Sequence, residues 1–554
     1  MKAFASIGQI VLLAFCFSSF AVSQESKFTN GLTAYLKKLG GESSTGAAIL
    51  VSKEGRIVFE GGFGYADLEK KVPITSETVF RIGSITKQFT AAAILRLVEQ
   101  EKVKLDDKLT KFFPDYPNGS DVTITQLLNH TSGLHSYTEK PDFYESVMQP
   151  VEPAKLIEWF KNDPPDFVPG AGFHYNNSGY FLLGEIIAKV SERSLSDYLH
   201  ESFFIPLKMN NSGVFVNASP PQSMATGYSF SEGKFNVALD WDMSRAGGAG
   251  AMYSTVGDLY RWNEALFGGQ VLNATSFKAA TTAVKLPAHV DGMNYGYGLA
   301  MYEVKRLPAI GHSGGLHGWS SNLVRLPQQQ CTIVVLENAL PGPPEHAPQS
   351  LSQLMVEKLF AEEIKKLPPI VEDTTIDPKT FVAYVGRFDY QGAAIMTVTS
   401  DEKGLFAQLT SQPKYQIIPR AKDEFFWKET DASVTFLRDE KGDVTAARHS
   451  QSGISFTAPR LPEEAVKLTA LQLDGLVGSY QYGPGAVLVV SREGTQLYGQ
   501  ITGQPKLPIF PKAEGEFEWR VVKAHVEFKK GEDGNVSKVI HHQNGTTFEA
   551  PKVK

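Results

Sequence analysis

The residues best placed for chemistry in this chain of 554 residues are a serine and a lysine three positions apart, Ser84 and Lys87. They open a run, Phe80 to Val98, whose apolar residues recur at helical spacing. Positions i and i+3 share one face of a helix, so both side chains can reach one pocket. The start of a helix also stabilises developing negative charge. This pattern suits a serine nucleophile with a lysine beside it.

Spacing alone leaves a structural alternative open, because serine is also common at helix N-caps. The Ser-x-x-Lys spacing recurs at Ser231-Lys234, Ser400-Lys403 and Ser411-Lys414. The first two fall in polar turns that contain glycine, and the third includes a proline that would break a helix interior. Only Ser84 heads a predicted amphipathic helix, which we expect to end near Glu101.

Two later segments carry further polar candidates. Tyr175 and Asn177 follow a Gly-rich loop and begin a second amphipathic helix. Taken alone, they are more typical of a packing residue and a cap. His312, which Ser313, Gly314 and Gly315 follow, lies in a predicted strand. His130, near the end of a short helix, is more typical of a structural histidine.

The elements around these residues predict an α+β domain, with an antiparallel sheet and helices against it. Ala47–Ser52 and Arg56–Gly61 form a predicted hairpin, and Leu307 to Leu336 a predicted meander. A small-residue stretch from Ala246 to Thr255 suggests close backbone packing before a helix at Val256–Leu266.

A linker, Lys365–Glu372, separates this domain from two tandem copies of an all-β unit. Val385 corresponds to Val477 and Pro459 to Pro551, a constant offset of 92 residues. Short strands with frequent turns predict two small barrels of lipocalin type. We place the hydrolase domain at 24–367 and the barrels at 368–462 and 463–554.

Residues 1–23 are typical of a cleavable signal peptide: Lys2 precedes an apolar stretch and Ala21-Val22-Ser23 offers a cleavage site. We therefore expect a secreted or periplasmic protein without a lasting membrane span. After cleavage Cys331 would be the remaining cysteine, in a buried-strand pattern that indicates an inert thiol.

Charge and motifs exclude several function classes. The net charge of −6 and the lack of a basic patch argue against nucleic-acid binding. No phosphate-binding loop occurs, and the histidines show no spacing typical of a zinc site. We therefore expect neither a cofactor nor a metal, and the sequence leaves the oligomeric state open.

Four segments together resemble the serine β-lactamase and penicillin-binding-protein superfamily, in its class C-like branch. In order they are Phe80–Lys87, Leu127–Leu134, Tyr175–Asn177 and His312–Gly314. The resemblance spans about residues 30–360 and implies a β-lactamase-like or transpeptidase-like fold. The barrels that follow resemble those of three-domain D-aminopeptidases.

The resemblance also implies roles. Ser84 is the nucleophile that forms an acyl-enzyme. Lys87 and Tyr175 share the general base, with a cationic Lys87 favouring a Tyr175 phenolate. Asn177 hydrogen-bonds Lys87 and the substrate amide.

For the substrate, the resemblance implies that the backbone N–H groups of Ser84 and Gly315 form the oxyanion hole. The strand residues His312, Ser313, Gly314 and Gly315 offer an edge to an extended peptide.

The resemblance places His312 where typical β-lactamases have lysine. We therefore expect the substrates to be small peptides or amides with D-residues rather than β-lactam antibiotics. Two alternatives stay open from the sequence. One is a carboxylesterase or weak β-lactamase with the same machinery, and the other is a non-catalytic penicillin-fold sensor of the cell wall.

Overall fold

The computed structural model describes residues 26–553, apart from short internal segments. The predicted signal peptide lies outside the described residues. The undescribed internal positions are 42, 141, 232, 287–293, 391–393, 411–412, 429–431, 440, 452–453, 463–467, 484–485, 503–505, 514, 520–523, 532 and 544–545. The chain divides into two compact units, the first ending at Leu367 and the second beginning at Pro368.

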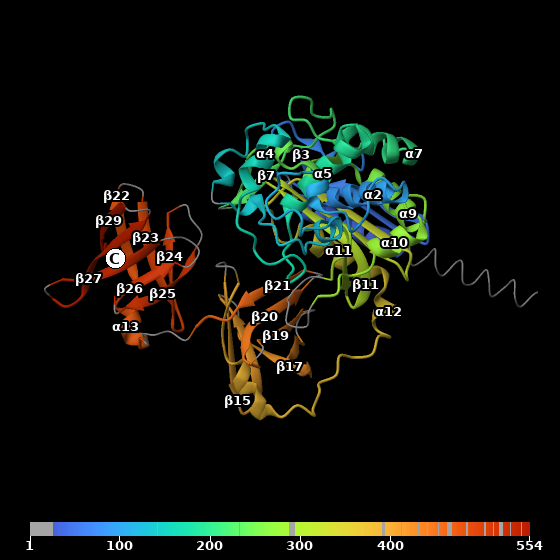
Figure 1. The fold of residues 1–554 in the computed structure, drawn as a ribbon. Helices are drawn as coiled ribbons and strands as arrows, with labels where there is room; N and C mark the ends of the chain where they lie inside the picture. The colour runs from blue at the N-terminus through green and yellow to red at the C-terminus, as the bar shows by residue number, and fades with distance from the viewer. Residues whose placement is uncertain are drawn as a thin grey trace, which may run out of the picture. The chain divides into compact units, whose positions relative to one another are not determined.

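The first unit, which runs from blue to yellow in Figure 1, is built on a six-stranded antiparallel sheet in the order β10-β11-β12-β13-β1-β2. Its strands are β1 (Ala47–Lys53), β2 (Arg56–Phe63), β10 (Ala300–Val304), β11 (Leu307–Leu316), β12 (Trp319–Leu326) and β13 (Cys331–Glu337). The predicted hairpin and meander are therefore neighbours in one sheet. β1 and β13 join them, with Ala47 opposite Glu337 and Lys53 opposite Cys331.

Helices cover both faces of this sheet, because its central strands carry apolar side chains on both faces. Ala48 and Leu50 of β1 pack into a large core with α2 (Thr86–Glu99), α5 (Asn177–Ser191) and α9 (Val256–Phe267). Ile49 and Val51 face the opposite side, towards helical residues 26–39 and α11 (Pro348–Leu359). The α+β prediction is confirmed.

Shorter elements complete this unit. The helices are α3 (Ile124–Leu128), α4 (Pro153–Phe160), α6 (Leu195–Leu199), α7 (Ile205–Leu207), α8 (Gly247–Gly250), α10 (Ala274–Ala280) and α12 (Ala361–Ile364). The strands are β3 (Tyr65–Asp67), β4 (Val72–Pro73), β5 (Phe80–Arg81), β6 (Gly213–Val214), β7 (Tyr228–Ser231), β8 (Lys234–Val237) and β9 (Met252–Ser254).

The helix α2 differs from its prediction in one respect. Its residues are buried on nearly every side, so it is a central helix rather than an amphipathic one at the surface. α5 and α8 pack against it. α8 also lies close against α5, since a Cβ on Gly248 would lie 3.0 Å from the Cα of Gly184 in α5.

The second unit contains two nearly closed eight-stranded antiparallel barrels, which confirms the predicted fold class. The first has β14 (Gly386–Asp389), β15 (Ile395–Asp401), β16 (Gly404–Leu409), β17 (Tyr415–Ala421), β18 (Glu424–Trp427), β19 (Ala432–Arg438), β20 (Val444–Gln451) and β21 (Ile454–Pro459). The second has α13 (Ala470–Asp474), β22 (Gly478–Gly483), β23 (Ala486–Glu493), β24 (Gln496–Ile501), β25 (Leu507–Ala513), β26 (Glu516–Trp519), β27 (Ala524–Lys530), β28 (Val536–Gln543) and β29 (Thr546–Pro551).

Each barrel closes where its last strand returns to its first. Phe388 bridges Arg460 in the first barrel, and Tyr480 bridges Lys552 in the second. The two bridges differ by the 92-residue offset of the repeat. In the described part of the chain, no helix is both long and apolar enough to span a bilayer.

Candidate active site

Ser84 lies in a 3₁₀ turn, Gly83–Ile85, that connects β5 to α2. Gly83 has a φ of +51°, in the left-handed region that favours glycine. A Cβ at this position would lie 2.8 Å from the backbone nitrogen of Gly315. The missing side chain therefore lets the serine turn lie directly against the end of β11.

Lys87 is fully buried, and its amine lies within hydrogen-bond distance of three oxygens. Its Nζ lies 3.1 Å from Ser84 Oγ, 2.8 Å from Asn177 Oδ1 and 2.8 Å from the carbonyl oxygen of Ala249 in α8. Burial drives the pKa of the Lys87 ammonium well below its usual range, because charge is disfavoured away from water.

The identity of these partners orients the amine when it is neutral. A neutral amine has two N–H donors and one lone pair. The carbonyl of Ala249 and Oδ1 of Asn177 can only accept, whereas the Ser84 hydroxyl can donate. The lone pair of Lys87 would then face the Ser84 proton, which is the arrangement a general base requires.

Tyr175 also faces this site. Lys87 Nζ lies 4.7 Å from the centroid of its ring. Its hydroxyl is buried and lacks a hydrogen bond of standard geometry. Burial raises the pKa of the Tyr175 phenol, and the nearby Ser84 hydroxyl opposes this rise only in part. The expected resting phenolate is therefore wrong: burial favours the neutral forms of both Tyr175 and Lys87.

Asn177 begins α5 and links Lys87 to a neighbouring loop. Its Oδ1 accepts from Lys87, as expected, while its Nδ2 donates to Thr138 Oγ1 at 2.9 Å. The backbone N–H of Asn177 donates to Ser136 Oγ at 3.2 Å. One of the two Nδ2–H donors thus binds the loop, and the second is left for the expected bond to substrate.

His312 is buried within β11 and neutral. Its Nδ1 lies 2.5 Å from the carbonyl oxygen of Ser313, which can only accept, so Nδ1 carries the proton. Its Nε2 then accepts from the Tyr295 hydroxyl at 2.9 Å. Burial is the main cause that lowers the pKa of His312 to about 3. This position provides no fixed positive charge.

The substrate-facing strand is partly open. β10 pairs with β11 only over Leu307–Gly311, so no described strand pairs with His312–Leu316 on that side. Gly314 permits close approach to the serine turn, since a Cβ there would lie 2.0 Å from the carbonyl oxygen of Ile82. The predicted edge, with Gly315 beside Ser84, is therefore brought to the site.

Sequence reasoning missed several groups that complete the site. They are the Ala249 carbonyl, the Tyr295 hydroxyl and Thr138, which bind Lys87, His312 and Asn177. The small-residue stretch around Ala249 was a usable signal. Tyr295 carried none.

His130 has the structural role that was expected. Its Nδ1 accepts from the backbone N–H of Asn176 at 3.0 Å, and its ring packs 4.5 Å from that of Tyr175. Cys331 is buried, and burial raises the pKa of its thiol to about 12. Ser231 and Lys234 pair across one hairpin turn, whereas Lys403 lies within the turn that follows Ser400. Ser411 lies outside the described residues.

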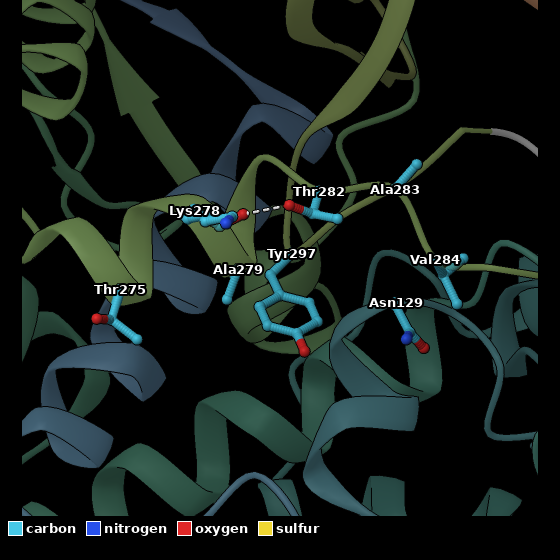
Figure 2. Close-up of a pocket in the computed structure, with 8 residues that line it drawn as sticks. All are labelled: Asn129, Thr275, Lys278, Ala279, Thr282, Ala283, Val284 and Tyr297. Atoms are coloured by element: carbon cyan, nitrogen blue, oxygen red, sulfur yellow. Dashed lines mark hydrogen bonds between the residues drawn. The ribbon is translucent and has the colours of Figure 1, made fainter.

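A separate pocket of about 380 Å³ opens beside α10 (Figure 2). It is lined by Asn129, Thr275, Lys278, Ala279, Thr282, Ala283, Val284 and Tyr297. Asn129 and Tyr297 are close in sequence to His130 and Tyr295, which pack against each other at 4.6 Å between ring centroids. None of the predicted catalytic side chains lines this pocket, so side-chain chemistry rather than pocket volume identifies the site.

A network of ion pairs connects the loops around Tyr175. His174 Nδ1 lies 2.6 Å from Asp166 Oδ2, and its Nε2 lies 3.1 Å from Glu139 Oε1. His135 Nδ1 lies 2.8 Å from the other oxygen of Asp166. The Glu139 hydrogen bond, reinforced by Asp166 and opposed by burial, raises the pKa of His174 to about 9. Glu139 follows Thr138, so the network holds the loop that binds Asn177.

This fold and this serine–lysine arrangement define the class of penicillin-fold serine hydrolases. The chain belongs to the beta-lactamase family, whose sequence model matches residues 32–354. A domain of unknown function, DUF3471, matches residues 372–458 and again 462–551.

Similar proteins agree with this assignment. A penicillin-binding protein of Bacillus subtilis is 26% identical over 430 residues, which cover 74% of this chain and 94% of that protein. The D-amino acid amidase of Ochrobactrum anthropi, solved with L-phenylalanine amide, is 26% identical with a TM-score of 0.52, covering 61% of this chain and 99% of that one. A D-stereospecific amidohydrolase from Streptomyces is 28% identical with a TM-score of 0.50, covering 58% and 96%.

The raised pKa of His174 predicts a pH dependence. Its stabilising contribution is fully present below the unfolded histidine pKa of about 6.5 and is lost as pH rises through about 9. The melting temperature of His174→Asn should therefore fall furthest below that of the wild type near pH 6 and converge with it above pH 9. Exposed His200→Asn is the control. A constant gap across this range would contradict the network's role.

Proposed function

We propose that this protein is an exported serine hydrolase that forms an acyl-enzyme at Ser84 and cleaves small peptides or amides containing D-amino acids. The observation that carries the proposal is the set of partners around Lys87. Two obligate acceptors, Asn177 Oδ1 and the Ala249 carbonyl, leave the lone pair of a neutral amine to the serine. Residues 1–23 supply the export signal in this proposal.

The first step transfers the Ser84 proton to Lys87 as Oγ bonds to the substrate carbonyl carbon. The backbone N–H groups of Ser84 and Gly315 stabilise the resulting oxyanion, an effect typically worth a few kcal/mol per donor. The carbonyl then re-forms and the C–N bond breaks. The leaving amine takes a proton that Lys87 holds and the Tyr175 hydroxyl can relay, and water later releases the acid from Ser84.

The environment of His312 supports amides with D-residues over β-lactams. A neutral imidazole between Tyr295 and the Ser313 carbonyl offers no fixed cation for a β-lactam carboxylate. The free edge of β11 suits an extended chain instead. The solved relatives with D-amino acid amidase or D-stereospecific amidohydrolase titles support the same choice.

Relative turnover tests the substrate class. We expect the purified protein to hydrolyse D-alanyl p-nitroanilide with a higher kcat/KM than its L-isomer, p-nitrophenyl butyrate or nitrocefin. A preference for the butyrate ester would favour the carboxylesterase alternative. Rapid turnover of nitrocefin would overturn the inference drawn from His312.

Covalent labelling tests the nucleophile. A fluorescent fluorophosphonate should label the wild-type protein, and Ser84→Ala should abolish the label. Ser400→Ala, which removes a serine with the same spacing to a lysine, should label normally. Absence of label on a folded wild-type protein would support a non-catalytic sensor.

Tyr175→Phe tests the proton relay. We expect kcat to fall about 10²–10⁴-fold, the usual contribution of an acid–base group. The melting temperature should change little, because the hydroxyl makes no hydrogen bond of standard geometry. Exposed Tyr144→Phe is the matched control. A fall in kcat below about tenfold would transfer the role to Lys87 alone.

A further inference from the structure

The last barrel carries a cluster of metal-ligating side chains on its outer surface. His525 and Glu527 of β27 and His542 of β28 place one ligand atom each within 4.8 Å of one another. His525 pairs directly with His542 across the strands, and their rings stack at 4.3 Å between centroids. The cluster was not expected from the sequence, where the histidines show no zinc spacing, because its ligands come from two strands.

One pair of donor atoms already has the spacing that metal ligation requires. His542 Nε2 lies 3.3 Å from Glu527 Oε1, close to the edge of a tetrahedron with bonds of about 2.0–2.1 Å. This nitrogen is shielded from solvent and makes no hydrogen bond of standard geometry. The other ring nitrogen, Nδ1, lies 3.2 Å from Thr547 Oγ1. A partner on the second nitrogen is the usual means of orienting a histidine ligand.

A further carboxylate borders the cluster. Glu516 of β26 lies opposite Glu527, and its Oε1 is 3.8 Å from His525 Nε2. Lys512 holds that carboxylate at 2.7 Å. Two imidazoles with one or two carboxylates form a borderline donor set, which suits Zn²⁺ better than Mg²⁺ or Ca²⁺.

The internal repeat supplies a comparison within the same chain. The offset of 92 residues places Ser433, Thr435 and Ser450 of the first barrel at the positions of His525, Glu527 and His542. The strands pair in the same register, since Ser433 lies opposite Ser450. The first barrel therefore forms the same fold without these three ligand residues, so the fold of the second barrel does not require them.

The histidine that faces inwards behaves differently. His449 and His541 occupy equivalent positions and are buried in both barrels. Each lies about 3 Å from a tyrosine hydroxyl, Tyr390 at 3.0 Å and Tyr482 at 2.9 Å. Packing explains the inner histidines. It does not require three ligating side chains on the outer face of one barrel alone.

We propose that His525, Glu527 and His542 form a zinc site that joins β27 to β28 on the second barrel. Zinc would add coordinate bonds across adjacent strands through His525, His542 and one oxygen of Glu527, while Lys529 ion-pairs with the other oxygen of that carboxylate. Because the ion binds the folded barrel, it would also stabilise that barrel.

Zinc titration of the untagged full-length protein against a chromogenic chelator tests this site. We expect one Zn²⁺ per chain and an increase in melting temperature, with no displacement by millimolar Mg²⁺. His542→Ala and His525→Ala should each weaken binding at least about tenfold, because even the loss of an outer-shell partner of a ligand costs about 10–100-fold in affinity. The double variant should abolish both binding and the thermal shift.

His200→Ala, at an exposed histidine in the other unit, should bind like the wild type. A folded double variant that still binds one Zn²⁺ would overturn the proposal, as would a wild type that binds none. Since all three ligands are partly exposed, folding should survive these substitutions. As an independent test, Ser433→His with Thr435→Glu and Ser450→His should raise the stoichiometry to two, and unchanged stoichiometry in this folded variant would count against the geometry.

Discussion

The buried amine of Lys87 is the constraint on which the catalytic unit depends. An ammonium group enclosed by apolar helices is costly unless each proton finds an acceptor or one proton leaves. The hydrogen-bond partners come from three elements: the Ser84 turn, Asn177 at the start of α5, and Ala249 in α8. The hydrogen bonds of this one lysine side chain therefore fix how the three elements pack together. They also leave a reactive lone pair beside the serine.

The second constraint is backbone proximity. Gly83 and Gly314 occupy positions where any Cβ would collide with the neighbouring segment, at 2.8 Å from Gly315 N and 2.0 Å from the Ile82 carbonyl. The serine turn and the substrate edge are consequently held against each other by main chain, which tolerates little displacement. The hydrogen bonds of Lys87 and the close backbone packing at Gly315 thus both fix the position of Ser84.

The barrels show how one fold can keep its core while its surface changes. Inner histidines, His449 and His541, keep the same hydrogen-bonded surroundings in both copies. The outer faces of the matching strands differ, with Ser433 and Ser450 in one and His525 and His542 in the other. Outward positions contribute little to packing, so the repeat can acquire new chemistry there without loss of the barrel.

The α+β unit, the two barrels and the candidate residues Ser84, Lys87, Tyr175 and His312 could all be predicted from the sequence, because periodicity, repeats and short motifs can be read along the chain. Protonation states and long-range contacts could not, because they depend on burial and on which segments pack together. Burial reversed the expected state of Tyr175 and made His312 neutral. Some contacts join segments that come together only on folding: those of the Ala249 carbonyl, of Tyr295, and of the cluster at His525 and His542. Spacing along the chain does not predict such contacts.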